Sequence, residues 1–137
     1  MEYAAPVWQP HLRKDIDRLE RVQHRATKML PNMSQLTYSE RLRRLKLPTL
    51  AFCRLRGDLI EVFKLTHVFY KINPVNFFTQ HQGTTRGHSY KLSTPSIRTN
   101  IRRYSYSFRI ISPWNSLPDK VVSATTLNTL KNRWSAI

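Results

Sequence analysis

Apolar residues recur at helical spacing in three long stretches of the sequence, and these stretches predict most of its secondary structure. The clearest covers residues 12–30, where an advance of about 100° per residue gathers the apolar residues on one side. We expect that side to face a core, and it consists of Leu12, Ile16, Leu19, Val22, Ala26, Met29 and Leu30. A second helix of about twenty residues is predicted to begin near Pro48 and to be the main core helix. A third is predicted within residues 123–137.

A short basic helix is predicted between the first two. Thr37 and Glu40 have the spacing of a capping box, in which each side chain bonds the backbone N–H of the other residue. We expect Leu42 and Leu45 to face inward. The residues expected to face outward are the basic ones, namely Arg41, Arg43, Arg44 and Lys46.

The helical pattern weakens in the second half of the chain. Residues 74–95 include a stretch rich in Thr, Gly, Ser and His, which predicts a loop or linker. Residues 97–106 mix arginine with tyrosine, and either a small hairpin or a basic arm fits them. The predicted fold is therefore mainly α, a small helical bundle of about three to five helices with a minor β-hairpin or an irregular basic arm in the second half.

The sequence is strongly positive. Lys and Arg number 23 against 8 acidic residues, which gives a formal net charge of +15 and a pI near 10.8. An excess of this size favours a polyanion as the partner. Because the cations are spread over the chain with aromatic residues between them, without a juxtamembrane cluster, nucleic acid is favoured over an anionic membrane.

Five cations of the first predicted helix recur at alternating steps of four and three, which stacks them opposite the apolar side. These residues, here called the basic ridge, are Lys14, Arg18, Arg21, Arg25 and Lys28. Asp17 is spaced to pair with Arg21 across one turn of the helix. Glu20 is spaced in the same way to pair with His24. The basic ridge is either a phosphate-binding surface or a solvated helix face, and this helix alone leaves both open.

Cations also alternate with aromatic rings late in the chain. Guanidinium groups bind phosphates through two hydrogen bonds, and aromatic rings stack on unpaired bases for about 1–3 kcal/mol each. The predicted nucleic-acid contacts of this part are Arg98, Arg102, Arg103, Tyr104 and Arg109; Arg43, Arg44 and Arg86 are further predicted contacts. The alternative is that the tyrosines cover the edge of the core while the arginines remain in water.

Candidate catalytic and metal-binding groups are scarce. The carboxylates include no pair suited to metal-ion catalysis, and the histidines lack cysteine partners and the spacing of zinc ligands. We therefore expect no metal, no cofactor and no small-molecule substrate. The single cysteine, Cys53, favours a reducing compartment, and the sequence shows neither a signal peptide nor an apolar run of roughly 20 residues. An intracellular protein without a membrane partner is expected.

Seven segments then follow one another in a recognisable order. They are residues 2–8 (EYAAPVW), 19–28 (LERVQHRATK), 38–42 (YSERL), 47–50 (LPTL), 54–60 (RLRGDLI), 85–89 (TRGHS) and 114–118 (WNSLP). Together they resemble the C-terminal region of reverse transcriptases from non-LTR retrotransposons, the LINE-type elements, especially jockey-like clades. The resemblance covers essentially the whole chain, and the ordered set is more specific than any one segment.

The resemblance implies a thumb and post-thumb region, which in such enzymes grips template and primer behind the active site. Residues 1–73 would form the thumb-like helical region, 74–95 a loop or linker, and 96–137 the post-thumb region. The family's catalytic aspartates belong to a palm motif with an Asp-Asp pair, and no such pair occurs here, so the chain is expected to be no enzyme by itself. The implied partners are RNA, DNA or a hybrid, bound with low sequence specificity, and the remaining polymerase domains. The alternatives are a protein-interaction module and a non-functional retroelement remnant.

Overall fold

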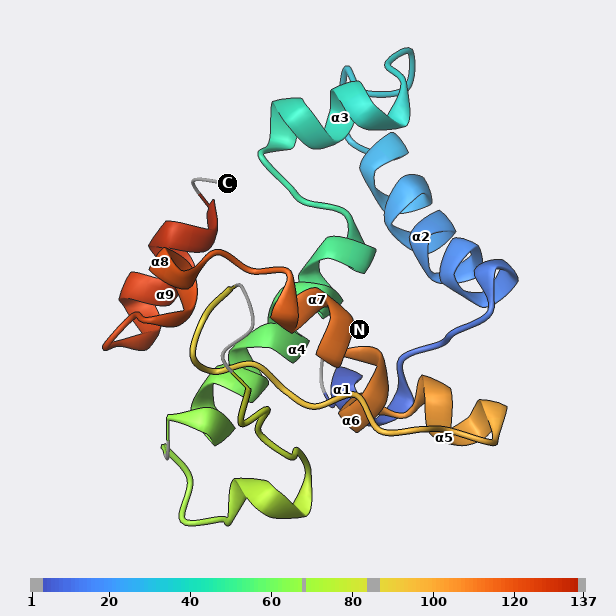
Figure 1. Ribbon diagram of the computed structural model, residues 1–137. Helices are drawn as coiled ribbons and strands as arrows, with labels where there is room; N and C mark the ends of the chain where they lie inside the picture. Colours follow the sequence, from blue (N-terminus) through green and yellow to red (C-terminus); the bar gives the residue numbers. More distant parts are fainter. Residues whose placement is uncertain (1–3, 68, 84–86, 136–137) are drawn as a thin grey trace. The chain divides into compact units, whose positions relative to one another are not determined.

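The computed structural model describes residues 4–67, 69–83 and 87–135 and is mainly helical, as predicted (Figure 1). The helices of eight residues or more are α2 (Arg13–Lys28), α3 (Tyr38–Leu45), α4 (Leu50–Thr66) and α9 (Leu127–Ser135). The shorter ones are α1 (Ala5–Trp8), the 3-10 helix η1 (Pro74–Asn76), α5 (Asn100–Tyr104), α6 (Tyr106–Arg109), α7 (Ile111–Asn115) and α8 (Asp119–Val122). The predicted hairpin is not confirmed: β pairing in the described ranges is limited to one isolated antiparallel bridge, between Gln80 and Leu92.

The chain divides into two compact units, Met1–Gly57 and Asp58–Ile137, and the division lies within α4. Each unit is therefore described by itself. The functional ranges implied by the resemblance, residues 1–73, 74–95 and 96–137, have other boundaries and stay predictions.

The capping box predicted at the start of α3 is confirmed. The backbone N–H of Thr37 donates to Oε2 of Glu40 at 2.8 Å, and the backbone N–H of Glu40 donates to Oγ1 of Thr37 at 3.4 Å. The hydrogen bonds from Thr37 lower the pKa of the Glu40 carboxyl, because they favour its charged form. Two of the otherwise unpaired N–H groups at the helix start are satisfied in this way.

In the first unit, α3 crosses near the C-terminal end of α2 at a steep angle, and the two helices meet through polar side chains (Figure 1). The hydroxyl of Tyr38 lies 2.6 Å from Oε1 of Glu20 and 2.9 Å from Oε1 of Gln23. Since a phenol has one hydrogen, the shorter, charge-assisted contact to Glu20 is its main bond. Burial and that bond raise the pKa of Tyr38 well above its ordinary value. The same Glu20 oxygen accepts the backbone N–H of Leu50 at 3.3 Å, and Gln23 donates to the carbonyl of Pro48 at 3.1 Å.

Arg41 is buried, and the prediction that it faces outward is wrong. Its Nε donates to Oγ1 of Thr27 at 3.3 Å and its Nη1 donates to the carbonyl of Leu36 at 2.7 Å. Its Nη2 is buried without a hydrogen-bond partner in the described residues. The other expectations for this helix hold in part: Leu42 is buried, Leu45 is half-buried, and Arg43, Arg44 and Lys46 are exposed.

The core of the second unit combines the later part of α4 with α7, α8 and α9. Leu59, Val62 and Phe63 of α4 are buried, which agrees with the prediction that this helix carries the main core. Trp114 of α7 is fully buried, and its ring is nearly perpendicular to that of His88, with ring centroids 5.9 Å apart. At the end of the chain, α8 and α9 lie against each other (Figure 1).

Side chains of α7 hold the segment around Leu92. Asn115 accepts the backbone N–H of Leu92 at 2.9 Å and donates to its carbonyl at 2.8 Å, so one amide satisfies both backbone groups. Nε1 of Trp114 donates to the carbonyl of Tyr90 at 2.8 Å. Residues 114–118 and 85–89, two segments of the family resemblance, are thus linked by contacts of Trp114 with His88, since Nε2 of His88 lies 3.1 Å from the Trp114 carbonyl.

His67, which directly follows α4, lies between two aromatic rings. Its ring stacks on Phe63 with centroids 4.0 Å apart and on Tyr90 with centroids 4.5 Å apart. Burial lowers the pKa of His67, because it disfavours the charged imidazolium.

Candidate nucleic-acid interface

All five residues of the basic ridge are exposed on α2. At 100° per residue, the basic ridge lies on a different side of the helix from Glu20, Gln23 and Thr27, which make the contact with α3. In the described part of the first unit, the hydrogen bonds between α2 and α3 therefore do not involve the ridge. Its exposed side chains are accessible to a binding partner.

Two ion pairs form on α2, but not the predicted ones. Asp17 pairs with Arg13 at 3.1 Å, and Asp15 pairs with Arg18 at 3.5 Å, both at exposed positions. The predicted pair of Asp17 with Arg21 is wrong because Arg13, one turn earlier, takes the carboxylate. The predicted pair of Glu20 with His24 is wrong because Tyr38 and Leu50 take Glu20. Within the described residues, Arg21, Arg25 and Lys28 have no acidic partner.

The prediction that the apolar side of α2 faces a core is wrong for most of its residues. Ile16 and Leu19 are half-buried, whereas Leu12, Val22, Ala26, Met29 and Leu30 are exposed, and Met29 keeps 85% of its surface. The buried residue of this helix is Thr27. The physical reason is that α3 packs against the polar strip of Glu20, Gln23 and Thr27, whose hydrogen-bonding groups are largely satisfied there.

Most of the other residues predicted to contact nucleic acid are exposed. Arg43 and Arg44 are exposed on α3, in the same unit as the basic ridge. In the second unit Arg98, Arg102, Arg103 and Tyr104 are exposed, the last three of them on α5. Arg86 lies outside the described residues.

Arg109 differs from the other predicted contacts, because it is engaged inside the second unit. Its Nε and Nη2 donate to Oδ2 of Asp58 at 3.3 and 3.0 Å, and the two side chains keep only 17% and 2% of their surface. Tyr106 donates its hydroxyl to the backbone carbonyl of Asp58 at 3.2 Å. Within α4 itself, Glu61 pairs with Lys64 at 2.7 Å. Arg109 thus joins α6 to α4.

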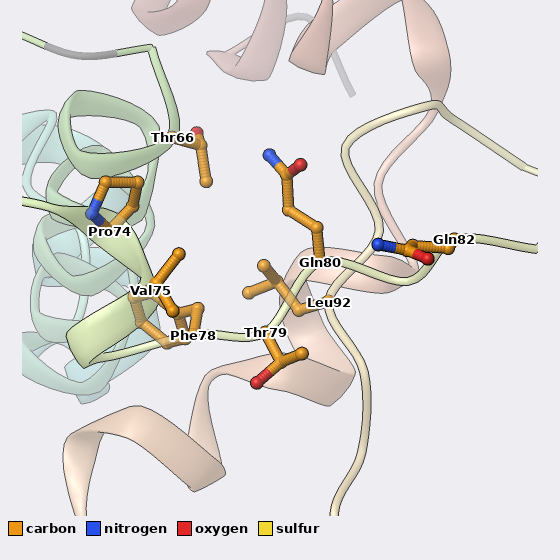
Figure 2. A pocket seen from close by; sticks show the side chains of 8 residues that line it. All are labelled: Thr66, Pro74, Val75, Phe78, Thr79, Gln80, Gln82 and Leu92. Carbon is orange, nitrogen blue, oxygen red and sulfur yellow. The ribbon is translucent and has the colours of Figure 1, made fainter.

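Two hollows flank the segment from Val75 to Thr79 in the second unit. The first, of about 340 Å³, is drawn in Figure 2, where the amide of Gln80 points across the hollow towards Thr66. Its other lining residues are Pro74, Val75, Phe78, Thr79, Gln82 and Leu92, so its walls are neutral. The second hollow, of about 250 Å³, shares Val75, Phe78 and Thr79 with the first and is lined in addition by Arg102 and Phe108.

Sequence reasoning missed the second hollow. It identified Arg102 from the run of cations, but not Asn76, Phe77 or Phe108, which line the same space. The signal in the sequence is Asn73-Pro74, which starts a turn, with two phenylalanines after two intervening residues.

The described residues contain no cluster of three or more His, Cys, Asp or Glu side chains placed to hold a metal ion. Among the helices of the described ranges, none has the length and apolar character needed to cross a bilayer.

Comparisons of the chain with models of protein families, with curated proteins and with solved structures find no match. The resemblance to non-LTR reverse transcriptases therefore stays a prediction from the seven sequence segments.

Proposed function

We propose that this chain binds nucleic acid through the sugar-phosphate backbone and corresponds to the C-terminal thumb and post-thumb region of a non-LTR retrotransposon reverse transcriptase. In this proposal it holds template and primer and carries no catalytic site of its own. One observation supports the binding most directly: the five cations of the basic ridge are exposed along one side of a single helix, away from the α3 contact.

The size of the basic ridge suits a phosphate backbone. Lys14 and Lys28 are separated by fourteen steps along α2, or about 21 Å at the rise of an α-helix. Phosphates of one DNA strand follow each other every 3.4 Å or so along the axis, so a surface of this length meets several of them. Contacts of this kind fix position without reading bases, and we therefore expect low sequence specificity.

The proposal is tested by the salt dependence of binding to a 20-base-pair duplex and to an RNA–DNA hybrid of the same length. With five phosphates neutralised, the slope of log K against log salt is about −4.5 for duplex DNA, so affinity falls roughly 500-fold between about 50 and 200 mM salt. A folded chain that binds neither probe, or binds with a flat salt dependence, contradicts the proposal and favours the remnant alternative.

A charge-matched pair of variants separates the basic ridge from net charge. In the first variant Arg21, Arg25 and Lys28 become Gln, which lowers the slope by about 2–3 units. In the control variant Lys46, Lys71 and Lys120, all exposed, become Gln, which removes the same charge from other places. Equal loss of slope in the two variants would show that the ridge has no special part in binding.

The protein-interaction alternative is favoured by the exposed apolar side of α2. Val22, Met29 and Leu30 lie on the surface of the first unit, where clustered apolar side chains often mark an interaction site. In this second proposal the apolar side of α2, rather than the basic ridge, binds the partner. It predicts association of the purified chain, or binding to other polymerase domains, that is lost when Met29 and Leu30 are replaced by Ser and is unchanged by the ridge variant.

A further inference from the structure

We propose that the second hollow, between η1 and the helices α5 and α6, takes one unpaired nucleotide of a single-stranded nucleic acid. The base would lie against the phenylalanines, and its phosphate against Arg102. This site goes beyond backbone binding by α2, because a phosphate backbone alone needs no base pocket, and it lies in the second unit.

One wall of the hollow comes from η1. The side chain of Asn73 accepts the backbone N–H of Val75 at 3.1 Å, and the carbonyl of Pro74 accepts the N–H groups of Phe77 and Phe78 at 3.0 and 2.9 Å. This turn leaves Phe77 with 43% of its surface exposed, while Phe78 is buried. The backbone hydrogen bonds of the turn therefore fix the position of Phe77, whose accessible ring lines the hollow.

The opposite wall comes from α5 and α6. The guanidinium carbon of Arg102 lies 5.2 Å from the ring centroid of Phe108, within the range of a cation–π contact. Ser107 lies beside Phe108 and lines the same hollow. The hollow thus has an aromatic ring on each wall and a cation at one of them.

The polar groups around the hollow can recognise the edge of a base. Within the described part of the chain, the side-chain amide of Asn76 and the hydroxyl of Ser107 have no hydrogen-bond partner in the protein. An amide offers both a donor and an acceptor, as does a hydroxyl. The volume of about 250 Å³ lies below the roughly 300–1,000 Å³ of pockets for drug-sized ligands, which suits a single base.

Charge decides which occupant the hollow favours. No Asp or Glu occurs in the sequence between Glu61 and Asp119, so no carboxylate of that stretch competes for Arg102. Arg98 and Arg103, close to Arg102 in the sequence, are exposed as well. The neighbouring hollow in Figure 2 has neutral walls with glutamine amides and offers no cation for a phosphate. Rings, free hydrogen-bonding groups and an uncompensated cation together match a nucleotide of a single strand, where stacking on aromatic side chains and cationic grooves are the usual means of binding.

The test compares two strands that differ only in their bases. The full chain is titrated with a twelve-nucleotide oligothymidylate and with an abasic strand of the same length, and binding is followed by fluorescence anisotropy. Since stacking contributes about 1–3 kcal/mol per base, we expect the oligothymidylate to bind roughly 5- to 160-fold more tightly than the abasic strand. Equal affinity for the two strands overturns the proposal, and so does the absence of binding to either one.

Two variants assign the preference to the hollow. Phe77→Leu keeps an apolar side chain but removes the ring, and should reduce the preference for the strand with bases to about twofold or less. Phe52→Leu is the matched control, because Phe52 has 42% of its surface exposed and lies in the first unit. It should leave the preference unchanged, and an equal effect of the two substitutions contradicts the proposal.

Arg102→Gln provides an independent readout on an exposed residue, and circular dichroism checks that the variant is folded. The substitution should weaken the binding of both strands. It should also lower the slope of log K against log salt by about 0.7 units, the value for one phosphate of a single strand. An unchanged slope overturns the assignment of the phosphate to Arg102. Binding of duplex by the basic ridge is measured separately. If the chain binds duplex but shows no preference for the strand with bases, this site is refuted while the backbone-binding proposal still holds.

Discussion

Replacing Arg109 with glutamine removes the cation that lies against the buried carboxylate of Asp58. Two N–H groups of Arg109 reach one oxygen of Asp58 at 3.0 and 3.3 Å, and the side chains keep 17% and 2% of their surface. Removing one partner of a buried ion pair costs about 3–5 kcal/mol. Because Arg109 is partly solvated and other groups remain around Asp58, we take the lower end, about 3 kcal/mol.

Equilibrium unfolding in urea, followed by circular dichroism at 222 nm, measures this loss. With a denaturant slope of about 1–3 kcal/mol per molar, the midpoint should fall by roughly 1–3 M. Arg103→Gln is the control, because Arg103 is exposed on α5 and its replacement should change stability by no more than about 0.5 kcal/mol. The cost of Arg109→Gln should also be smaller when Asp58 is already Asn, as for any two residues that interact directly.

The reasoning is refuted if Arg109→Gln is no more destabilising than Arg103→Gln. Its effect on nucleic-acid binding is a second check. We expect the folded Arg109→Gln variant to keep the salt slope of the unmodified chain, because this guanidinium is occupied by Asp58 rather than offered to phosphate. A reduced salt slope would indicate that Arg109 does contact phosphate.

Two further predictions concern the second unit. Because burial lowers the pKa of His67 in the folded chain, the unfolded chain takes up the proton first as the pH falls below about 6.5. Stability should therefore decline as the pH falls through about 6.5, and this decline should be smaller in His67→Gln. An identical pH profile of the two proteins would contradict the prediction. Asn115→Ala removes both hydrogen bonds to Leu92 and should cost about 1–3 kcal/mol, at roughly 1 ± 0.5 for each bond. Amide exchange at Leu92 should become faster in that variant, whereas Asn128→Ala on the exposed side of α9 should change neither quantity.

The positions of the long helices could be predicted from the sequence because they depend on local signals. The stretch 12–30 became α2 within two residues at either end, and the capping box of Thr37 formed as expected. The helix predicted near Pro48 is α4 and carries core residues of the second unit. In each case the spacing of apolar residues and the residues at the helix ends are contained in one short segment.

The contacts of those helices could not be predicted in the same way. Amphipathic spacing says that α2 has an apolar side, but not that an element of this chain covers it. The side that α3 does contact consists of polar residues, whose partners Tyr38, Pro48 and Leu50 lie 15 to 30 positions away in the sequence. A buried polar side chain is stable only when such distant partners are in place, so Glu20 and Arg41 appear from the sequence as surface residues.

Of the candidate nucleic-acid interface, only the exposed cations could be predicted from the sequence. Exposed cations such as Arg21 and Arg102 follow from composition and spacing, and the structure places them on the surface. The structural role of Arg109 depends on Asp58, 51 positions earlier in the chain. The walls of the second hollow come from residues about 30 positions apart, such as Phe77 and Phe108. Such juxtapositions depend on tertiary structure and leave no periodic signal.

The contact of Asn115 with Leu92 also bears on aggregation. The carbonyl of Lys91 and the N–H of Ser93 bond towards residues 79–81, while both backbone groups of Leu92 are taken on the other side by the Asn115 amide. A side chain thus occupies the place where a neighbouring strand from another molecule would otherwise add, which is the usual hazard of an unprotected edge. If the chain binds nucleic acid as proposed, copies would be concentrated along one polyanion, and we expect this amide to hinder pairing between their backbones.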